Sequence, residues 1–384
     1  EVSYWAPLER QYNLYRLTEA GTLASVSPPS QRSLKVTPYV LGAFERGGNA
    51  EPGTHNEMDV GFDAKIALTP SLMLDVTYNT DFAQVEVDEV QVNLDRFSIF
   101  LPEKRPFFLE NAGQFSVGDP GDVELFFSRR IGLEKGQVVP IDVGARLTGK
   151  VGDFDIGALN IGTDGSDLSS VESTDFSVLR IKRDVLSRSR IGMIYTDRSK
   201  SLVGEGANTL YGVDGTFNFL DDIQISTFAA KSESPGFSGD DESYMANFNY
   251  NGDRYGFRSG YLVVEDNFNP EVGFKRRNNF KQYEGNLRFS PRPASIESIR
   301  QLSFEAQTRS YWSATSGALE TRRHELIFNT QFENGDQFRA TTRDEFEMLT
   351  RGFQIAPKVS LLPGTYDFSS HEISYSLGPQ RNVS

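Results

Sequence analysis

The side chains with the greatest capacity for chemistry lie in one stretch, Asp81 to Arg130, where charged residues are interleaved with valine and phenylalanine. The charged residues in it that we single out as candidate site residues are Asp81, Glu86, Arg96, Glu103, Lys104, Arg105, Glu110, Arg129 and Arg130. A charge placed in hydrocarbon is costly, so this stretch cannot lie in lipid, and it is too apolar for a loop in water. The composition predicts a segment folded inside a container that the rest of the chain forms.

Two interpretations of this segment stay open, and they are compatible. In the first, residues 102–110 form a lumenal plug or constriction whose charges pair with one another and with wall residues such as Arg146 or Lys150, which decides what can pass. In the second, the same charges form a buried ion-pair network that only holds the segment in place. Pairing would be needed in either case, because a lone buried ion is strongly destabilising.

The rest of the chain offers little support for catalysis or metal binding. His55, His324 and His371 are scattered without metal-ligand spacing. Residues 236–239 lack the five-residue pattern of a nucleophile elbow, and the acidic residues at 164–167 and 240–242 do not reproduce a calcium loop. Cysteine is absent, which excludes disulfides, thiolate metal sites and a cysteine nucleophile. We therefore predict no enzyme, no metal and no cofactor.

Composition and charge restrict the class of protein to which this chain can belong. The chain has 384 residues, a net charge of −14 and 12% aromatic residues, a balance that makes nucleic acid an unsuitable partner. No run of about 18 apolar residues exists, so no transmembrane helix is predicted. A membrane β-barrel turns only every second residue of a strand toward lipid. The mean hydropathy of −0.42 is therefore compatible with such a barrel.

The elements around the charged stretch are predicted to be β-hairpins. Apolar and polar residues alternate through Met58 to Ile66 and, after a short turn, through Leu72 to Tyr78. The same plan recurs along the chain, with Asn-Gly turns at 251–252 and 334–335, a strong hairpin signal. We count about 14–16 strands, and we find no repeat of the length of a propeller blade.

Two further features favour a membrane barrel. Short turns, such as 151–153, 220–222 and 251–253, alternate with longer polar connections, such as 163–173, 198–207 and 232–241, as in outer-membrane barrels. Tyrosine and phenylalanine stand at the ends of the predicted outward-facing sets, as at the two lipid–water boundaries. The predicted fold is therefore all-β, an antiparallel transmembrane β-barrel with an internal plug-like insertion.

The charged stretch also resembles a known signature. Its motifs are Asp81-Phe82, Gln84-Val85-Glu86, Gln91-Val92-Asn93-Leu94, Arg96-Phe97, Pro102-Glu103-Lys104-Arg105-Pro106-Phe107-Phe108-Leu109-Glu110 and Phe127-Ser128-Arg129-Arg130-Ile131-Gly132. They resemble those of an uncharacterised bacterial family of outer-membrane β-barrel domains that follow family-nine-type carbohydrate-binding domains. The resemblance implies the outer membrane of a Gram-negative bacterium, with lipid and lipopolysaccharide as partners. Carbohydrate, or proteins of a larger envelope complex, would be further partners.

The resemblance also suggests a domain organisation. Residues 1–32 would be a lead-in or the tail of a preceding domain, residues 33–384 the barrel, and residues 81–130 the plug. The family pattern implies more strands beyond Ser384, so the barrel would be closed by a further piece or by a partner.

The predicted function is selective passage of solutes across the outer membrane, glycan-related by family association, with the acidic net charge favouring cations or neutral sugars. One alternative is a non-conducting anchor or assembly component that displays a carbohydrate-binding domain or a larger complex at the surface. A second alternative is a barrel enzyme acting on glycans or lipids.

Overall fold

The computed structural model describes residues 34–46, 54–79, 97–134, 137–165, 172–356 and 359–378. The predicted lead-in at residues 1–32 and three predicted site residues, Asp81, Glu86 and Arg96, lie outside these ranges. No helix within them has the length and apolar character needed to cross a membrane.

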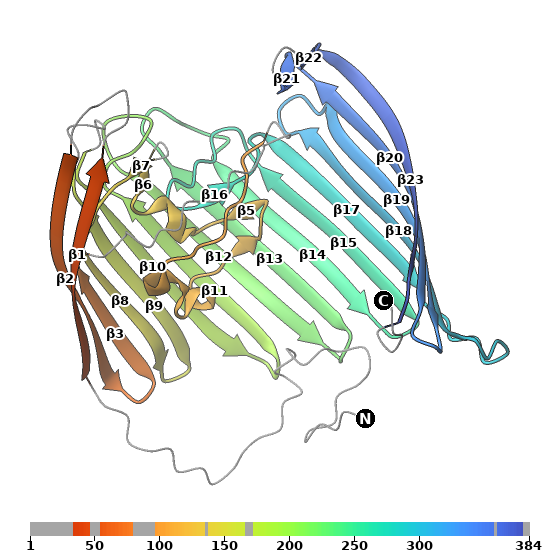
Figure 1. Ribbon diagram of the computed structural model, residues 1–384, viewed down its shortest axis with the longest axis horizontal. Helices are drawn as coiled ribbons and strands as arrows, with labels where there is room; N and C mark the ends of the chain where they lie inside the picture. The colour runs from red at the N-terminus through yellow and green to blue at the C-terminus, as the bar shows by residue number, and fades with distance from the viewer. Residues whose placement is uncertain are drawn as a thin grey trace, which may run out of the picture.

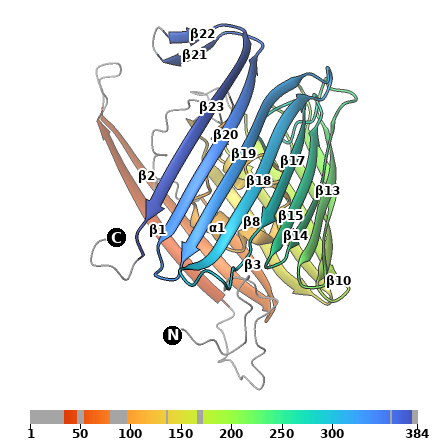
Figure 2. The same ribbon diagram turned by 90° about the vertical axis from the view of Figure 1, so that its right-hand side faces the viewer.

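Within these ranges, sixteen antiparallel strands form one large sheet in which neighbours along the chain are neighbours in space. The strands are β1 (Leu34–Arg46), β2 (Thr54–Thr69), β3 (Leu72–Tyr78), β8 (Ile141–Val151), β9 (Phe154–Thr163), β10 (Thr174–Val185), β11 (Ser189–Arg198), β12 (Asn208–Phe219), β13 (Ile223–Glu233), β14 (Glu242–Asn251), β15 (Tyr255–Val264), β17 (Phe280–Phe289), β18 (Ile299–Ser313), β19 (Leu319–Phe332), β20 (Gln337–Leu349) and β23 (Gly364–Ser376). The sheet is strongly curved (Figures 1 and 2). The predicted all-β antiparallel fold and the predicted number of strands are confirmed.

The connections at the two edges of the sheet differ in length. At one edge, below the strands in Figure 1, tight turns join β8 to β9 at residues 152–153 and β12 to β13 at residues 220–222. At the opposite edge the connections are longer, such as residues 199–207 and 265–279. We call these the turn edge and the loop edge. The predicted alternation of short turns and long loops is present, although the connection of residues 290–298 makes the turn edge less uniform.

The convex face of the sheet is apolar and exposed. Large hydrophobic side chains on it are left uncovered, among them Val213, Met193, Leu287 and Leu326. Aromatic rings form a row near the turn edge, where the ring centroids of Tyr255 and Phe289, Phe289 and Phe304, and Phe304 and Phe328 are 5.4, 6.4 and 5.0 Å apart. A second group lies near the loop edge at Tyr195, Tyr211, Tyr244, Tyr261 and Tyr283. An exposed apolar face of this extent requires a covering.

The concave face holds the segment between β3 and β8 (Figure 1). Its described part contains α1 (Pro106–Leu109), the 3-10 helices η2 (Ala112–Gln114) and η3 (Ser128–Arg130), and the short strands β4 (Gly118–Asp119), β5 (Val123–Glu124), β6 (Leu133–Glu134) and β7 (Gln137–Val138). We call residues 97–134 the insertion. Short β21 (Phe353–Ala356) and β22 (Val359–Leu361) pair with each other in the connection between β20 and β23.

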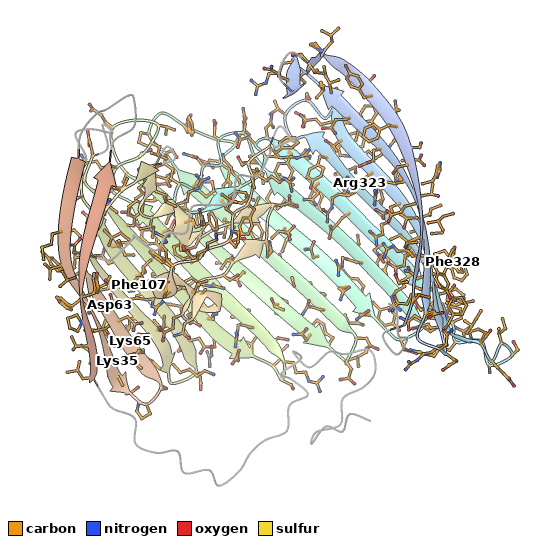
Figure 3. All side chains as sticks on the ribbon, viewed as in Figure 1. Lys35, Asp63, Lys65, Phe107, Arg323 and Phe328 are labelled. Carbon is orange, nitrogen blue, oxygen red and sulfur yellow. The ribbon has the colours of Figure 1, made fainter. Side chains whose placement is uncertain are left out.

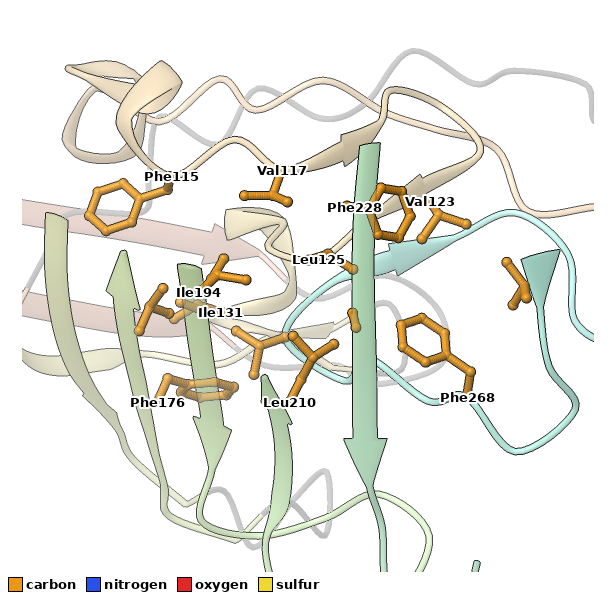
Figure 4. Close-up of a cluster of buried hydrophobic side chains, with 14 of the residues drawn as sticks. Phe115, Val117, Val123, Leu125, Ile131, Phe176, Ile194, Leu210, Phe228 and Phe268 are labelled. Carbon is orange, nitrogen blue, oxygen red and sulfur yellow. The ribbon is translucent and has the colours of Figure 1, made fainter. Parts of the chain in front are cut away.

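The hydrophobic core lies between the insertion and the concave face of the wall (Figure 4). The insertion contributes Phe108, Phe115, Val117, Val123, Leu125 and Ile131. The wall contributes, among others, Leu159, Ile161, Phe176, Val178, Ile194, Leu210 and Phe228. The interior beneath the insertion is apolar and buried, because these strands carry apolar residues on both faces.

The sheet is an open wall within the described part of the chain. Its order begins at β1 and ends at β23, and these two strands are not paired with each other. Each of them has 13 residues, so each presents a long edge of backbone donors and acceptors.

Candidate functional site

Arg146 joins the insertion to the wall. It lies on β8, its side chain is 2% exposed, and its guanidinium pairs with the Asp75 carboxylate of β3 at 2.5 Å. The same guanidinium donates to the backbone carbonyl of Glu110 at 2.7 Å and to that of Phe107. It also lies 4.9 Å from the centroid of the Phe107 ring. One wall residue thus holds the end of α1 through charge, hydrogen bonds and a ring contact.

The side chain of Glu110 faces a second basic group. Lys65 of β2 forms an ion pair with the Glu110 carboxylate, and Lys35 of β1 lies opposite Lys65 in the ladder. Figure 3 shows Lys35, Asp63 and Lys65 close to Phe107 on this side of the wall. The hydrogen bond from Lys65 outweighs partial burial and holds the pKa of Glu110 below its ordinary value. The predicted pairing of Glu110 with Arg146 is present at 3.8 Å.

Glu103 and Arg105 form an ion-pair network inside the insertion. The Arg105 guanidinium donates to the Glu103 carboxylate at 2.7 Å, to the Ser128 carbonyl at 2.7 Å and to the Ile131 carbonyl at 2.6 Å. The Ser128 hydroxyl also donates to Glu103, at 2.5 Å. These bonds tie the start of α1 to η3, and the ring of Phe108 lies 4.2 Å from the guanidinium carbon.

Acid is expected to loosen this network. Burial opposes the charged form of Glu103, but the hydrogen bonds and the charge of Arg105 hold its pKa below the ordinary 4.5. A carboxyl with a lowered folded-state pKa stabilises the fold above its unfolded-state pKa, and the contribution is lost as the pH falls below it. We expect the free energy of unfolding, measured in urea, to decrease below about pH 4.5. Glu103→Gln should show a smaller decrease, and an unchanged pH dependence in that variant would contradict this assignment.

The remaining predicted residues have different partners. Arg129 is buried and donates to the Pro102 carbonyl at 3.0 Å, and Arg130 donates to the Gly273 carbonyl at 3.1 Å. Lys104 is half-buried, and its backbone N–H donates to Glu103. Lys150 lies apart from the insertion charges that we had expected it to pair with. It is near Asp155 and Asp184 of the wall, at 3.9 and 3.6 Å.

We did not predict from the sequence that residues 265–279 contribute to this site. Within this loop, β16 (Phe274–Lys275) pairs with β5, so that a three-stranded sheet forms from β16, β5 and β4. Phe127 donates its N–H to the Val272 carbonyl at 2.8 Å. Burial lowers the pKa of Lys275 to about 8, and its ammonium donates to the Phe268 carbonyl. The insertion and this loop are folded together.

The loop is itself fixed to the wall through Glu271. This buried carboxylate lies 3.7 Å from Arg198 of β11 and accepts hydrogen bonds from the Ser201 hydroxyl, the Leu202 N–H and the Asn269 amide. The apolar residues at 268, 272 and 274 were the available signal in the sequence, since they are unusual in a long polar connection.

The tip of the insertion reaches the opposite side of the lumen. Asp122 is buried, and its carboxylate lies 3.5 Å from the Tyr311 hydroxyl of β18. The guanidinium carbon of Arg277 lies 3.6 Å from the Phe97 ring centroid and 3.9 Å from that of Tyr311, so it joins the insertion to the wall.

Beyond this contact the concave face is polar and uncovered. A cavity of about 220 Å³ lies on β15, β17, β18 and β19, and its lining includes Arg258, Glu284, Asn286, Gln307, Arg309 and Arg323. A second cavity, of about 390 Å³, includes Ser290, Gln301, Ser303, Asn329, Gln331 and Arg339 in its lining. The same strands are apolar on their convex face, as Arg323 and Phe328 of β19 illustrate (Figure 3).

Neither a metal centre nor a catalytic group emerges from the described residues. No three of their histidine and carboxylate side chains gather as metal ligands. His324 and His371 lie on β19 and β23, away from the insertion.

Comparisons with known proteins give two kinds of similarity. A family described as a domain of unknown function, DUF5916, matches residues 29–144, which include the whole charged stretch. The fold is similar to that of *Pseudomonas aeruginosa* OccK8 (OprE), with 10% identity over 90% of this chain and 89% of that chain and a TM-score of 0.40. It is also similar to *Acinetobacter baumannii* OccAB2, with 11% identity over 89% of each chain and a TM-score of 0.37. A BenF-like porin from *Pseudomonas fluorescens* Pf-5 has 10% identity over 91% of this chain and 89% of that chain, with a TM-score of 0.37.

Comparison with curated protein sequences gave no match. The similarities in fold are too weak to bear on function, and the family match carries no activity.

Proposed function

We propose that this chain is the wall and plug of a channel in the outer membrane of a Gram-negative bacterium, and that it passes small polar solutes. One observation carries the proposal. The strands β15 and β17 to β20 bear exposed apolar and aromatic residues on one face and charged residues around uncovered cavities on the other. Lipid outside and water inside is the environment in which both faces are stable.

The insertion supports a selective rather than a wide passage. It packs against the concave face of β8 to β15, with an apolar core between the two. Its tip contacts Tyr311 on β18. The space that remains lies between this tip and the polar face of β17 to β20. Solutes would therefore pass along the charged wall, where side chains replace part of their hydration.

A membrane location places a requirement on β1 and β23. Unpaired backbone groups are costly in hydrocarbon, so the proposal requires that both edges be covered, by further strands or by a partner. The glycan relation rests on the family resemblance alone, and the described residues add no support to it.

Single-channel conductance in a planar lipid bilayer tests the proposal. We expect the protein to give discrete currents, and Gln307→Trp, which enlarges a side chain on the lumenal face, to reduce them. Ala306→Trp is the matched control, because the preceding residue of β18 lies among the apolar side chains of the convex face and should leave the current unchanged. Absence of current in every variant, with the protein inserted, would favour the non-conducting anchor instead. Turnover of glycans or lipids without current would favour the enzyme.

A further inference from the structure

We propose that the lumen holds a binding site for small zwitterionic solutes, with their anionic group on Arg309 and Arg323 of the wall and their cationic group at Asp119 of the insertion. The inference rests on the proposed function and names the class of solute. It differs from the preference for cations or neutral sugars that the net charge of −14 suggested, because the charge of the whole chain does not describe the charge at this wall.

On one row of the wall, arginine guanidinium groups project into the lumen. In one row of the ladder Glu284 lies opposite Arg309, Arg309 opposite Arg323, and Arg323 opposite Glu345. The ion pair of Arg309 with Glu284 spans 3.0 Å, and that of Arg323 with Glu345 spans 2.5 Å. The arginine side chains are 54% and 56% exposed, whereas each glutamate is 19% exposed. The carboxylates thus lie at the wall and the cationic groups project into the lumen.

These arginines are arranged to receive an anion. Two neighbouring guanidinium groups offer several N–H donors in a planar geometry that matches a carboxylate. Each keeps donors beyond those used by its glutamate, and each is held in position by that glutamate. The adjacent cavity of about 220 Å³ also offers Asn286 and Gln307, whose amides can hydrogen-bond a solute.

The insertion supplies the opposite charge. Asp119 lies on β4 at the tip, where its backbone carbonyl accepts a hydrogen bond from the Asp122 N–H at 3.1 Å. The Asp122 carboxylate lies 3.5 Å from the hydroxyl of Tyr311, which is two residues from Arg309 on β18. Burial, together with the charges of Asp122 and Glu284, raises the pKa of Asp119 to about 6. A cationic group beside Asp119 would stabilise its charged carboxylate, because the present surroundings of this carboxylate disfavour the charge. A solute with an ammonium group would provide that neighbour while its carboxylate meets the arginines.

Three solutes of similar size test the proposal: 4-aminobutyrate, butyrate and butylamine. In proteoliposomes that contain the protein, after subtraction of entry into protein-free liposomes, we expect 4-aminobutyrate to enter faster than either singly charged solute. Because hydrogen bonds to charged groups are among the stronger ones, each preference should be about tenfold or more, which corresponds to about 1.4 kcal/mol or more. Arg309→Gln with Arg323→Gln should abolish the preference over butylamine, and Asp119→Asn the preference over butyrate. Arg190→Gln is the control, since Arg190 is an arginine paired with Asp184 near the turn edge.

Equal entry of the three solutes, or faster entry of a singly charged one, would overturn the inference while leaving the channel intact. Saturation-transfer NMR with 4-aminobutyrate and the detergent-solubilised protein separates binding from transport. Binding that the double arginine variant abolishes, without entry of any solute, would support the site and contradict the channel. Neither binding nor entry would overturn both.

Discussion

Replacement of Arg146 by alanine is expected to release the insertion from the wall. The change leaves the Asp75 carboxylate buried without its partner and removes the donors to the Phe107 and Glu110 carbonyls. Breaking a buried ion pair by removing one partner costs about 3–5 kcal/mol. We expect a loss of that size in the free energy of unfolding. We also expect trypsin to cleave after Arg129, which is buried in the docked insertion.

Arg190→Ala is the matched control for Arg146→Ala. Arg190 also pairs with a wall carboxylate, but its side chain is 44% exposed and that of Asp184 is 50% exposed. An exposed pair of this kind contributes less than about 1 kcal/mol. If Arg146→Ala costs no more than Arg190→Ala, or if trypsin leaves the insertion intact, then Arg146 does not hold it.

Replacement of Phe115 by alanine should have a comparable effect through packing. The ring is 4% exposed and lies over Gly157 of β9, where an added β-carbon would come within 2.9 Å of the ring atom Cε1. Removing a buried phenylalanine side chain costs about 3–5 kcal/mol, because the cavity is only partly refilled. Gly157→Val alone should cost about 1–3 kcal/mol through overpacking.

The two changes together test whether ring and glycine share one space. The valine should occupy part of the cavity left by Phe115→Ala, so the double variant should lose less stability than the sum of the single variants. Gly162→Val is the control on the other face of β9, where an added β-carbon comes no closer than 3.4 Å to its neighbours. Strict additivity in urea unfolding would show that Phe115 does not pack against Gly157.

The wall could be predicted from the sequence because its signals are local. Alternation with a period of two and the turns at residues 69–71 and 251–253 specify hairpins, in which each strand pairs with the next one along the chain. The strong mixture of charge and phenylalanine in residues 81–130 also indicated a segment enclosed by the wall, and the structure describes residues 97–130 of it. Glu103 and Arg105 are two residues apart in the sequence, so their ion pair is also a local feature.

The contacts of the insertion could not be predicted, because they join distant parts of the chain. Nothing local indicates that Phe127 bonds to Val272, or that β5 pairs with β16. The dry interior had a signal that was overlooked. Phe176 and Val178 point inward while Leu179 and Ile181 point outward, so β10 is apolar on both faces and must be covered on both.

The central claim is that one wall separates lipid from a wet lumen, and cysteine labelling at two adjacent residues of β17 tests it most directly. Asn286 lines the lumenal cavity, and Leu287 lies on the convex face with 59% of its surface exposed. The chain has no cysteine of its own, so each introduced cysteine is the single reporter. In proteoliposomes we predict that a charged, water-soluble thiosulfonate modifies Asn286→Cys, while Leu287→Cys reacts only with a lipid-soluble maleimide. Equal modification of both by the water-soluble reagent would place the convex face in water and contradict the account.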